Sequence, residues 1–346
     1  MKAYALRRDE ASADRLAGRL LCHPLRGAQG EAAFAKGAVI QEGDVPAVMA
    51  LPWDVLHLVE RAPDELLEED AGRRLASAVA GDGIEVRDFS GGRSPLAAAA
   101  RGILRVNVDA LQRMNSVEGV SVYTLYDRQI TERGDVVAQA KITPFVLAES
   151  RVAEAERIAR DADGVVKVHP FVPMTVGAVV KESLGERAMA RFRDALQAKI
   201  AWFGSRLVEP AFVSPTADAI AAAIELLRQG GAQVIIVAGA KAMDPLDPAF
   251  QALETLGIGI DRHGVPAHPG SLFWLGHAGN SIVLGMPTCG LFSKATVFDL
   301  ILPRVLAGET VNSSALAELG HGGLLSHDMA YRFPPYDPSA SRGAAE

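Results

Sequence analysis

The run Val-Ile-Ile-Val-Ala at residues 234–238, followed directly by Gly239, constrains the fold of this chain more than any other feature. Five apolar residues without polar alternation predict a strand that is buried on both faces. Such strands occur in parallel sheets with helices on each side, and ligands bind beyond the carboxyl ends of these strands. The sequence therefore predicts an α/β fold with a binding site in the turn after residue 238.

Strand and helix patterns alternate from about residue 173 onwards, as in a layered α/β domain. Gly204 is expected to end the first of these helices in a left-handed conformation, and Pro303 to kink or shorten the last one. The expected strands cover residues 176–180, 207–213, 234–238, 258–265 and 281–284, and the expected helices cover residues 186–203, 216–229, 248–256 and 293–306.

The first half of the chain is richer in short strand signals that are separated by turn residues. Strands are expected over residues 37–51, 55–60, 84–89, 103–108, 120–126 and 136–147, with helices over 64–79 and 149–160. We therefore predict a β-rich, barrel-like α+β domain over residues 1–172, an α/β domain over 173–310 and a C-terminal tail over 311–346, disordered after Pro334.

Composition excludes several classes of function. The net charge is -7 and no run of Lys or Arg forms a basic stripe, so nucleic acid is not an expected partner. Cys22 and Cys289 are the only two cysteines and lie far apart in sequence, so neither a disulfide framework nor a CxxC-type zinc site is supported. The N-terminus lacks the apolar core of a signal peptide, and no segment approaches the roughly 20 apolar residues of a membrane span. We expect a cytoplasmic protein.

The turn after residue 238 carries Lys241, Asp244 and Asp247. A lysine and carboxylates in one turn suit a phosphate with its metal ion, although a solvated surface ion pair has the same sequence pattern. Asp247 precedes Pro248 and can therefore be a helix N-cap, or a ligand for Mg²⁺. The turn has neither Walker A spacing nor a GxGxxG pattern.

A second loop, residues 262–271, follows the expected strand 258–265 and contains Pro266, Pro269 and Gly270. These residues predict a rigid loop in which His268 and Ser271 offer hydrogen-bond donors to a polar ligand. His263, His268 and His277 together invite a metal-site hypothesis, but they lack the i, i+4 spacing of a helical metal site. An exposed loop histidine is the other interpretation of His268.

A third loop, residues 285–296, leads from a strand into a helix. Amide groups in the first turn of that helix, together with Ser293 and Lys294, predict an anion site to which Thr288 contributes. Cys289 is a nucleophile, a sulfur contact to a bound metal, or a small buried residue that fills space.

These three loops, each after a strand and in this order, resemble those of the molybdenum-cofactor-binding domain that MogA, MoeA and gephyrin-type proteins share. The resemblance covers residues 173 to about 308. The family's first loop reads roughly TGGxSxGxxD, and residues 238–247 align with it without a gap, which puts the family's aspartate on Asp247. Its GVxxxPG loop falls on residues 264–270, and its PGNP-to-helix segment falls near residues 286–296.

The resemblance implies a three-layer α/β/α domain that binds the pterin dithiolene and phosphate of molybdopterin, or the molybdenum cofactor, across these loops. Asp247, Asp244 and Lys241 are then the candidate catalytic residues, with Asp247 handling Mg²⁺ or phosphate. The candidate cofactor contacts are Gly239, Ala240, His268, Pro269, Gly270, Ser271, Thr288, Ser293 and Lys294.

The function implied is cofactor biosynthesis or delivery, by adenylylation of molybdopterin with Mg²⁺ and ATP or by metal insertion. Ala238, Ala240 and Ala242 replace residues of the family loop, and this favours binding over catalysis. The alternatives are a non-catalytic scaffold that docks on a molybdoenzyme client, and a Mg²⁺-dependent nucleotide phosphohydrolase. A homo-oligomer is expected, with Trp202-Phe203 or Phe273-Trp274 supplying an exposed apolar patch.

Overall fold

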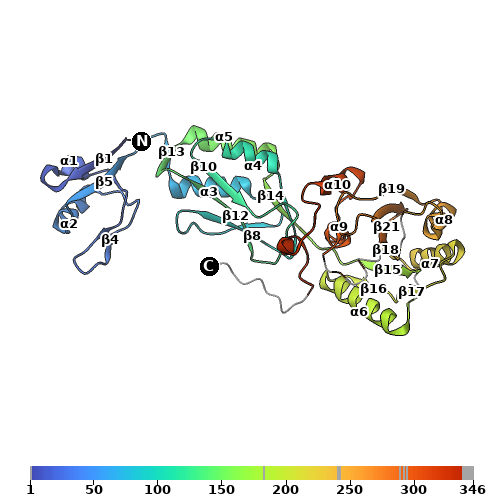
Figure 1. The fold of residues 1–346 in the computed structure, drawn as a ribbon. Helices are drawn as coiled ribbons and strands as arrows, with labels where there is room; N and C mark the ends of the chain where they lie inside the picture. The colour runs from blue at the N-terminus through green and yellow to red at the C-terminus, as the bar shows by residue number, and fades with distance from the viewer. Residues whose placement is uncertain are drawn as a thin grey trace. The chain divides into compact units, whose positions relative to one another are not determined.

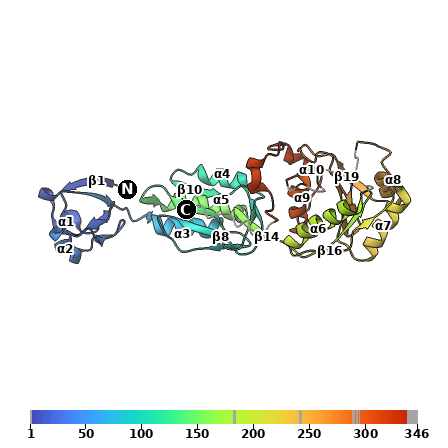
Figure 2. The same ribbon diagram turned by 60° about the horizontal axis from the view of Figure 1, so that its bottom comes forward.

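The computed structural model describes residues 2–181, 184–239, 243–287, 290, 293 and 295–336. The chain forms two compact units (Figures 1 and 2). The first unit comprises Met1–Ala99, Val106–Asp127 and Arg133–Lys167, and the second comprises Ala100–Arg105, Arg128–Glu132 and Val168–Glu346. No helix in the described part of the chain is long and apolar enough to cross a membrane.

The second unit is built on a sheet with the strand order β16-β15-β18-β21-β20-β19, and β17 pairs beside β15. β15, β18 and β21 run parallel to one another, whereas β20 runs antiparallel to β21 and to β19. The strands are β15 (Thr175–Val180), β16 (Arg206–Leu207), β17 (Ala211–Phe212), β18 (Val234–Ala238), β19 (Gly259–His263), β20 (Trp274–Ala278) and β21 (Ser281–Met286).

Helices cover both faces of this sheet (Figure 1). Alternate residues of β18 face opposite sides, so Val234 and Ile236 pack with α6 and α9, whereas Ile235 and Val237 pack with α7 and α8. An α/β fold is therefore confirmed, and residues 234–238 are completely buried as the apolar run predicts. The helices are α6 (Glu186–Trp202), α7 (Ala217–Gln229), α8 (Pro248–Thr255), α9 (Val297–Leu306) and α10 (Ser313–Ala317), with the 3-10 helices η4 (Glu318–Gly320) and η5 (His327–Arg332).

Local signals set the ends of these helices. Gly204 follows α6 with φ +73°, as predicted, and Thr216 caps α7 by accepting a hydrogen bond from the Ala219 amide. Helix α9 begins at Val297 rather than at residue 293, because Thr296 and Asp299 form a capping box there. Pro303 lies inside α9 without ending it.

The first unit contains several small sheets. One has the order β1-β5-β2 and another has the order β10-β12-β8-β7, on which α3 packs. Its elements are β1 (Lys2–Arg7), α1 (Ala13–Leu16), β2 (Leu20–Leu21), β3 (Leu25–Arg26), β4 (Ala32–Phe34), α2 (Val45–Ala50), β5 (Val55–Glu60), β6 (Glu65–Leu67), α3 (Glu68–Val79), β7 (Ile84–Val86), β8 (Ser94–Ala98), α4 (Val108–Asn115), β10 (Val120–Thr124), β12 (Val136–Ile142), β13 (Val146–Ala148) and α5 (Glu149–Asp161).

The structure departs from the sequence expectations in three respects. The strand expected over residues 37–51 is largely a 3-10 helix (Glu42–Asp44) and α2, because a capping box between Gln41 and Asp44 starts a helical segment there. Helix α4, capped by Asn107, and strand β20 were not predicted. The expected exposed apolar patch is not formed by these pairs, since Phe203, Phe273 and Trp274 are buried in the described fold and Trp202 is half-buried.

Residues 100–105 and 128–132 belong to the second unit although the first unit surrounds them in sequence. They form most of β9 (Gly102–Val106) and β11 (Ile130–Thr131), which share a sheet with β14 (Val166–Pro170). Arg105 of β9 donates to Glu309 at 2.8 Å, and Arg304 of α9 donates to the same carboxylate at 2.9 Å. Burial alone raises the pKa of Glu309, but the hydrogen bonds from Arg105 and Arg304 outweigh it and lower the pKa.

We predict that Glu309→Gln destabilises the protein by about 3 kcal/mol, because it leaves two guanidinium groups without their shared buried carboxylate. Since the folded-state pKa of Glu309 lies below its usual value of 4.5, its contribution is present above pH 4.5 and is lost as pH falls through the folded-state pKa. Urea unfolding from neutral to acidic pH measures both effects. Glu209→Gln, which removes an exposed pair with Arg193, is the control and should change stability little. Equal effects of the two variants would contradict the prediction.

Candidate functional site

The register of the sheet brings the three predicted loops to one edge. Val180 is opposite Ala238, and Ala238 is opposite Met286, so the residues that follow β15, β18 and β21 all leave the sheet on the same side. Because β20 is antiparallel and pairs Trp274 with Gly285, the loop of residues 264–273 reaches β20 at that edge too. We call this the ligand edge: the loops of residues 239–247, 264–271 and 287–296 with Lys181, which follows β15.

A buried ion pair lies at the ligand edge. The Lys181 Nζ atom donates to both carboxylate oxygens of Asp247, at 2.7 Å to Oδ1 and 2.5 Å to Oδ2. The side chains of Lys181 and Asp247 are only 6% and 4% exposed. Asp247 Oδ1 also accepts a hydrogen bond of 2.8 Å from the Ala249 amide, which confirms Asp247 as the N-cap of α8.

Lys181 is the residue of this site that sequence reasoning missed. It stands directly after the wholly apolar end of β15, at the position where Gly239 follows β18. A charged residue at the carboxyl end of a buried parallel strand is itself a signal for a site residue.

The first loop carries four other candidates, Gly239, Ala240, Lys241 and Asp244. Gly239 has φ +85° and its amide donates to the carbonyl of Met286, so it continues the pairing of β18 with β21. Asp244 is exposed, and its Oδ1 accepts from the Leu246 amide at 2.9 Å within the turn. Ala240 and Lys241 lie outside the described residues.

The second loop is tied to two other segments. His268 exchanges backbone hydrogen bonds with Gly323 and Leu325, and the bond between His268 and Pro269 is cis. The Pro269 carbonyl accepts a hydrogen bond of 3.1 Å from the Val297 amide at the start of α9. The second and third loops are therefore joined directly.

Gly270 makes this junction possible. Its φ is +108°, and a Cβ atom at this position would lie 2.9 Å from the amide nitrogen of Val297. The imidazole of His268 is exposed, whereas Ser271 is half-buried.

His263, His268 and His277 do not form a cluster that could bind a metal ion. His263 pairs with Trp274 and His277 pairs with Gly259, so these two lie at opposite ends of the β19–β20 ladder. His277 instead contacts Asp261 at 2.6 Å. Among the described residues, no group of three His, Cys, Asp or Glu side chains is placed to hold a metal ion.

A second buried ion pair holds the third loop. Lys199 of α6 donates to Asp299 of α9 at 2.6 Å and to the carbonyl of Ser293 at 2.6 Å. Asp299 also accepts from the hydroxyl of Tyr336 at 2.8 Å and from the amide and hydroxyl of Thr296. Burial, and then the charge of Asp299, raise the pKa of Tyr336 well above its usual value, so the phenol stays protonated as the donor.

The anion site expected at the first amides of α9 needs correction. The amides of Thr296 and Val297 already donate to Asp299 and Pro269. Ser293 keeps a hydroxyl near the loop, where its Oγ accepts from the Ala295 amide at 3.3 Å. Thr288, Cys289 and Lys294 lie outside the described residues, so their roles stay predictions.

We predict that Tyr336→Phe lowers the free energy of unfolding by about 2 kcal/mol, because it removes a hydrogen bond to a buried carboxylate. Thermal unfolding followed by circular dichroism measures the change. Tyr123→Phe is the matched control, since the Tyr123 hydroxyl bonds the neutral Gln139 on an exposed surface, and it should cost less than about 0.5 kcal/mol. An unchanged Tm for Tyr336→Phe would contradict the role of this network.

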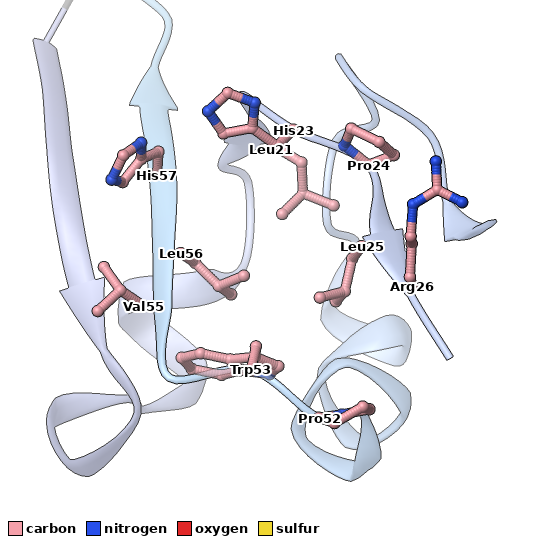
Figure 3. A pocket seen from close by; sticks show the side chains of 10 residues that line it. All are labelled: Leu21, His23, Pro24, Leu25, Arg26, Pro52, Trp53, Val55, Leu56 and His57. Atoms are coloured by element: carbon pink, nitrogen blue, oxygen red, sulfur yellow. The ribbon is translucent and has the colours of Figure 1, made fainter. Parts of the chain in front are cut away.

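The first unit has a cavity of about 310 Å³ (Figure 3). Leu21, Leu25, Trp53 and Leu56 turn towards one another there, whereas His57 and Val55 point to the other side of β5 (Figure 3). Its remaining lining residues are His23, Pro24, Arg26 and Pro52. None of the described site candidates lines this cavity, and its apolar lining residues Leu21, Leu25, Trp53 and Leu56 belong to the core beside the β1-β5-β2 sheet.

No protein-family model matches the chain, and no curated protein matches its sequence. Solved structures of molybdenum-cofactor biosynthesis proteins are among its structural neighbours. The MoeA molybdopterin biosynthesis protein from Pyrococcus horikosii is 11% identical, covers 89% of this chain and 76% of its own, and has a TM-score of 0.29. MogA is 15% identical, covers 43% of this chain and 96% of its own, and has a TM-score of 0.23.

A further neighbour is CinA from Thermoplasma acidophilum, a protein with unknown function, which is 11% identical. It covers 34% of this chain and 90% of its own, with a TM-score of 0.27. With identities and TM-scores this low, these likenesses carry no argument. The assignment of function rests on the residues of this chain.

Proposed function

We propose that the second unit binds molybdopterin or the molybdenum cofactor at the ligand edge, and that the protein acts in the biosynthesis or delivery of that cofactor. The observation that carries the proposal is the convergence of three loops, which are separated in sequence, at the carboxyl edge of one parallel sheet. These are the loops whose residues resemble the family's binding loops. Under this proposal the receiving partner is a molybdoenzyme.

The chemistry of the edge supports an anionic pterin ligand. Lys181 neutralises Asp247, so this buried carboxylate does not repel a phosphate group. His268 presents an exposed imidazole, and Ser271 and Ser293 offer hydroxyl donors. Gly239 and Gly270, both with positive φ, let the backbone take turns that side chains would block.

The hydrogen bonds of Asp247 favour a binding function over adenylylation. The resemblance implies that Asp247 handles Mg²⁺ or phosphate. In the structure its carboxylate caps α8 and accepts hydrogen bonds from Lys181 through both oxygens. We therefore propose a binding or delivery protein as the first function. Adenylylation remains the second, and incubation with molybdopterin, ATP and Mg²⁺ separates the two, because only a transferase releases pyrophosphate.

We predict that Gly270→Ala weakens molybdopterin binding at least tenfold, equivalent to about 1.4 kcal/mol, because the new methyl group forces the second and third loops apart. Equilibrium dialysis of the full chain against molybdopterin, with the pterin measured in its fluorescent oxidised form, gives the dissociation constant. Gly279→Ala is the matched control: Gly279 also has positive φ, +62°, but a Cβ atom there meets nothing within 4 Å.

His268→Ala against His277→Ala forms a second matched pair, because both imidazoles are exposed but His277 lies on β20 and contacts Asp261. Only the His268 variant should lose affinity. The proposal fails if the wild-type protein binds no form of the pterin, or if Gly270→Ala and His268→Ala both bind it as the wild type does.

A further inference from the structure

We propose that the ligand edge works without a divalent cation, because the ammonium group of Lys181 takes the place that a metal ion would occupy on Asp247. The inference rests on the proposed function and specifies how the site handles an anionic ligand. It also turns the prediction of Mg²⁺ at Asp247 into a question that a measurement can decide.

The Asp247 carboxylate oxygens already have hydrogen-bond partners. A carboxylate that binds Mg²⁺ directs an oxygen lone pair at the ion at close to 2.0–2.1 Å. Asp247 Oδ1 already accepts from Lys181 and from the Ala249 amide, and Oδ2 accepts from Lys181. The pair is also almost closed to water, at 6% and 4% exposure.

Exchange of the ammonium group for Mg²⁺ is also costly. For Mg²⁺ to bind Asp247, the ammonium group has to leave, and the buried lysine would then lack its compensating charge. Breaking a buried ion pair in this way costs about 3–5 kcal/mol. Mg²⁺ also sheds its water shell reluctantly, so it gains little from a site that already holds a cation.

The neighbouring carboxylate, Asp244, is a single exposed group. It accepts a hydrogen bond from the Leu246 amide within its own turn. No cluster of three potential metal ligands occurs in the part of the chain that the structure describes. On this inference, hydrogen-bond donors bind a phosphate at the ligand edge, beside a buried ion pair without net charge, and no ion is coordinated to Asp247.

Two measurements on the full-length protein test the inference. The first is the dissociation constant of molybdopterin in EDTA and in excess Mg²⁺, which should agree within about twofold. The second uses Mg²⁺ alone and follows the Tm, which should not rise with Mg²⁺ in the wild type because Lys181 already occupies both carboxylate oxygens of Asp247.

Variants give the test its control. Lys181→Met frees the Asp247 carboxylate, so the Tm of this variant should rise with Mg²⁺. The double variant Lys181→Met with Asp247→Asn keeps an uncharged side chain that can still cap α8, and Mg²⁺ should not change its Tm. If Lys181→Met does not fold, the Tm of the wild type and of Asp247→Asn, each with and without Mg²⁺, still tests the inference.

The inference is overturned if wild-type binding or Tm depends on Mg²⁺ and Asp247→Asn removes that dependence. Failure of the proposed function has a different signature, namely no pterin binding in either EDTA or Mg²⁺. The Tm measurements with Mg²⁺ alone remain informative in that case, because they involve no pterin.

Discussion

The parallel pairing of β15, β18 and β21 is the constraint on which the rest of the second unit depends. Because both faces of these strands are apolar, helices have to cover each side, and only the ends of the strands are left for polar chemistry. Parallel direction then forces the segments after Val180, Ala238 and Met286 to meet. The direction of the strands therefore sets the position of the ligand edge, and the side chains there determine its chemistry.

Buried ion pairs connect segments that the strand pairing of this sheet does not join. Lys181 with Asp247 joins the end of β15 to the start of α8, and Lys199 with Asp299 joins α6 to α9 and to the backbone of Ser293. Glu309 with Arg105 and Arg304 ties β9 to the end of α9. The pairs of Lys181 with Asp247, Lys199 with Asp299 and Arg105 with Glu309 link parts of the chain that are distant in sequence. Breaking one of them is costly because it leaves a buried charge without its partner.

The sequence was sufficient for features that depend on local periodicity. The apolar run at residues 234–238, the alternation of helices and strands after residue 173, the stop at Gly204 and the cap at Asp247 are all present. Patterns of three to ten residues decide these features, and the same residues make the contacts. The α/β fold and the order of the loops were accessible for that reason.

Partners that are far away in sequence could not be predicted in the same way. Nothing near Lys181 indicates that it pairs with Asp247, and nothing near Asp299 indicates Lys199 or Tyr336. Strand β20 was missed because Trp274 needs the space left by Gly285 on the neighbouring strand, and that depends on register. Three of the four aromatic residues expected at the surface, Phe203, Phe273 and Trp274, are buried for a similar reason, because tertiary packing covers them.

The most direct test is a crystal structure of the full-length protein soaked with molybdopterin, read in a difference electron-density map. The account predicts pterin and phosphate density at the ligand edge, in contact with His268 and the turn at Gly239, with the pair between Lys181 and Asp247 intact. Density confined to the cavity beside Trp53 in the first unit, or a metal ion on Asp247 with Lys181 displaced, would contradict it.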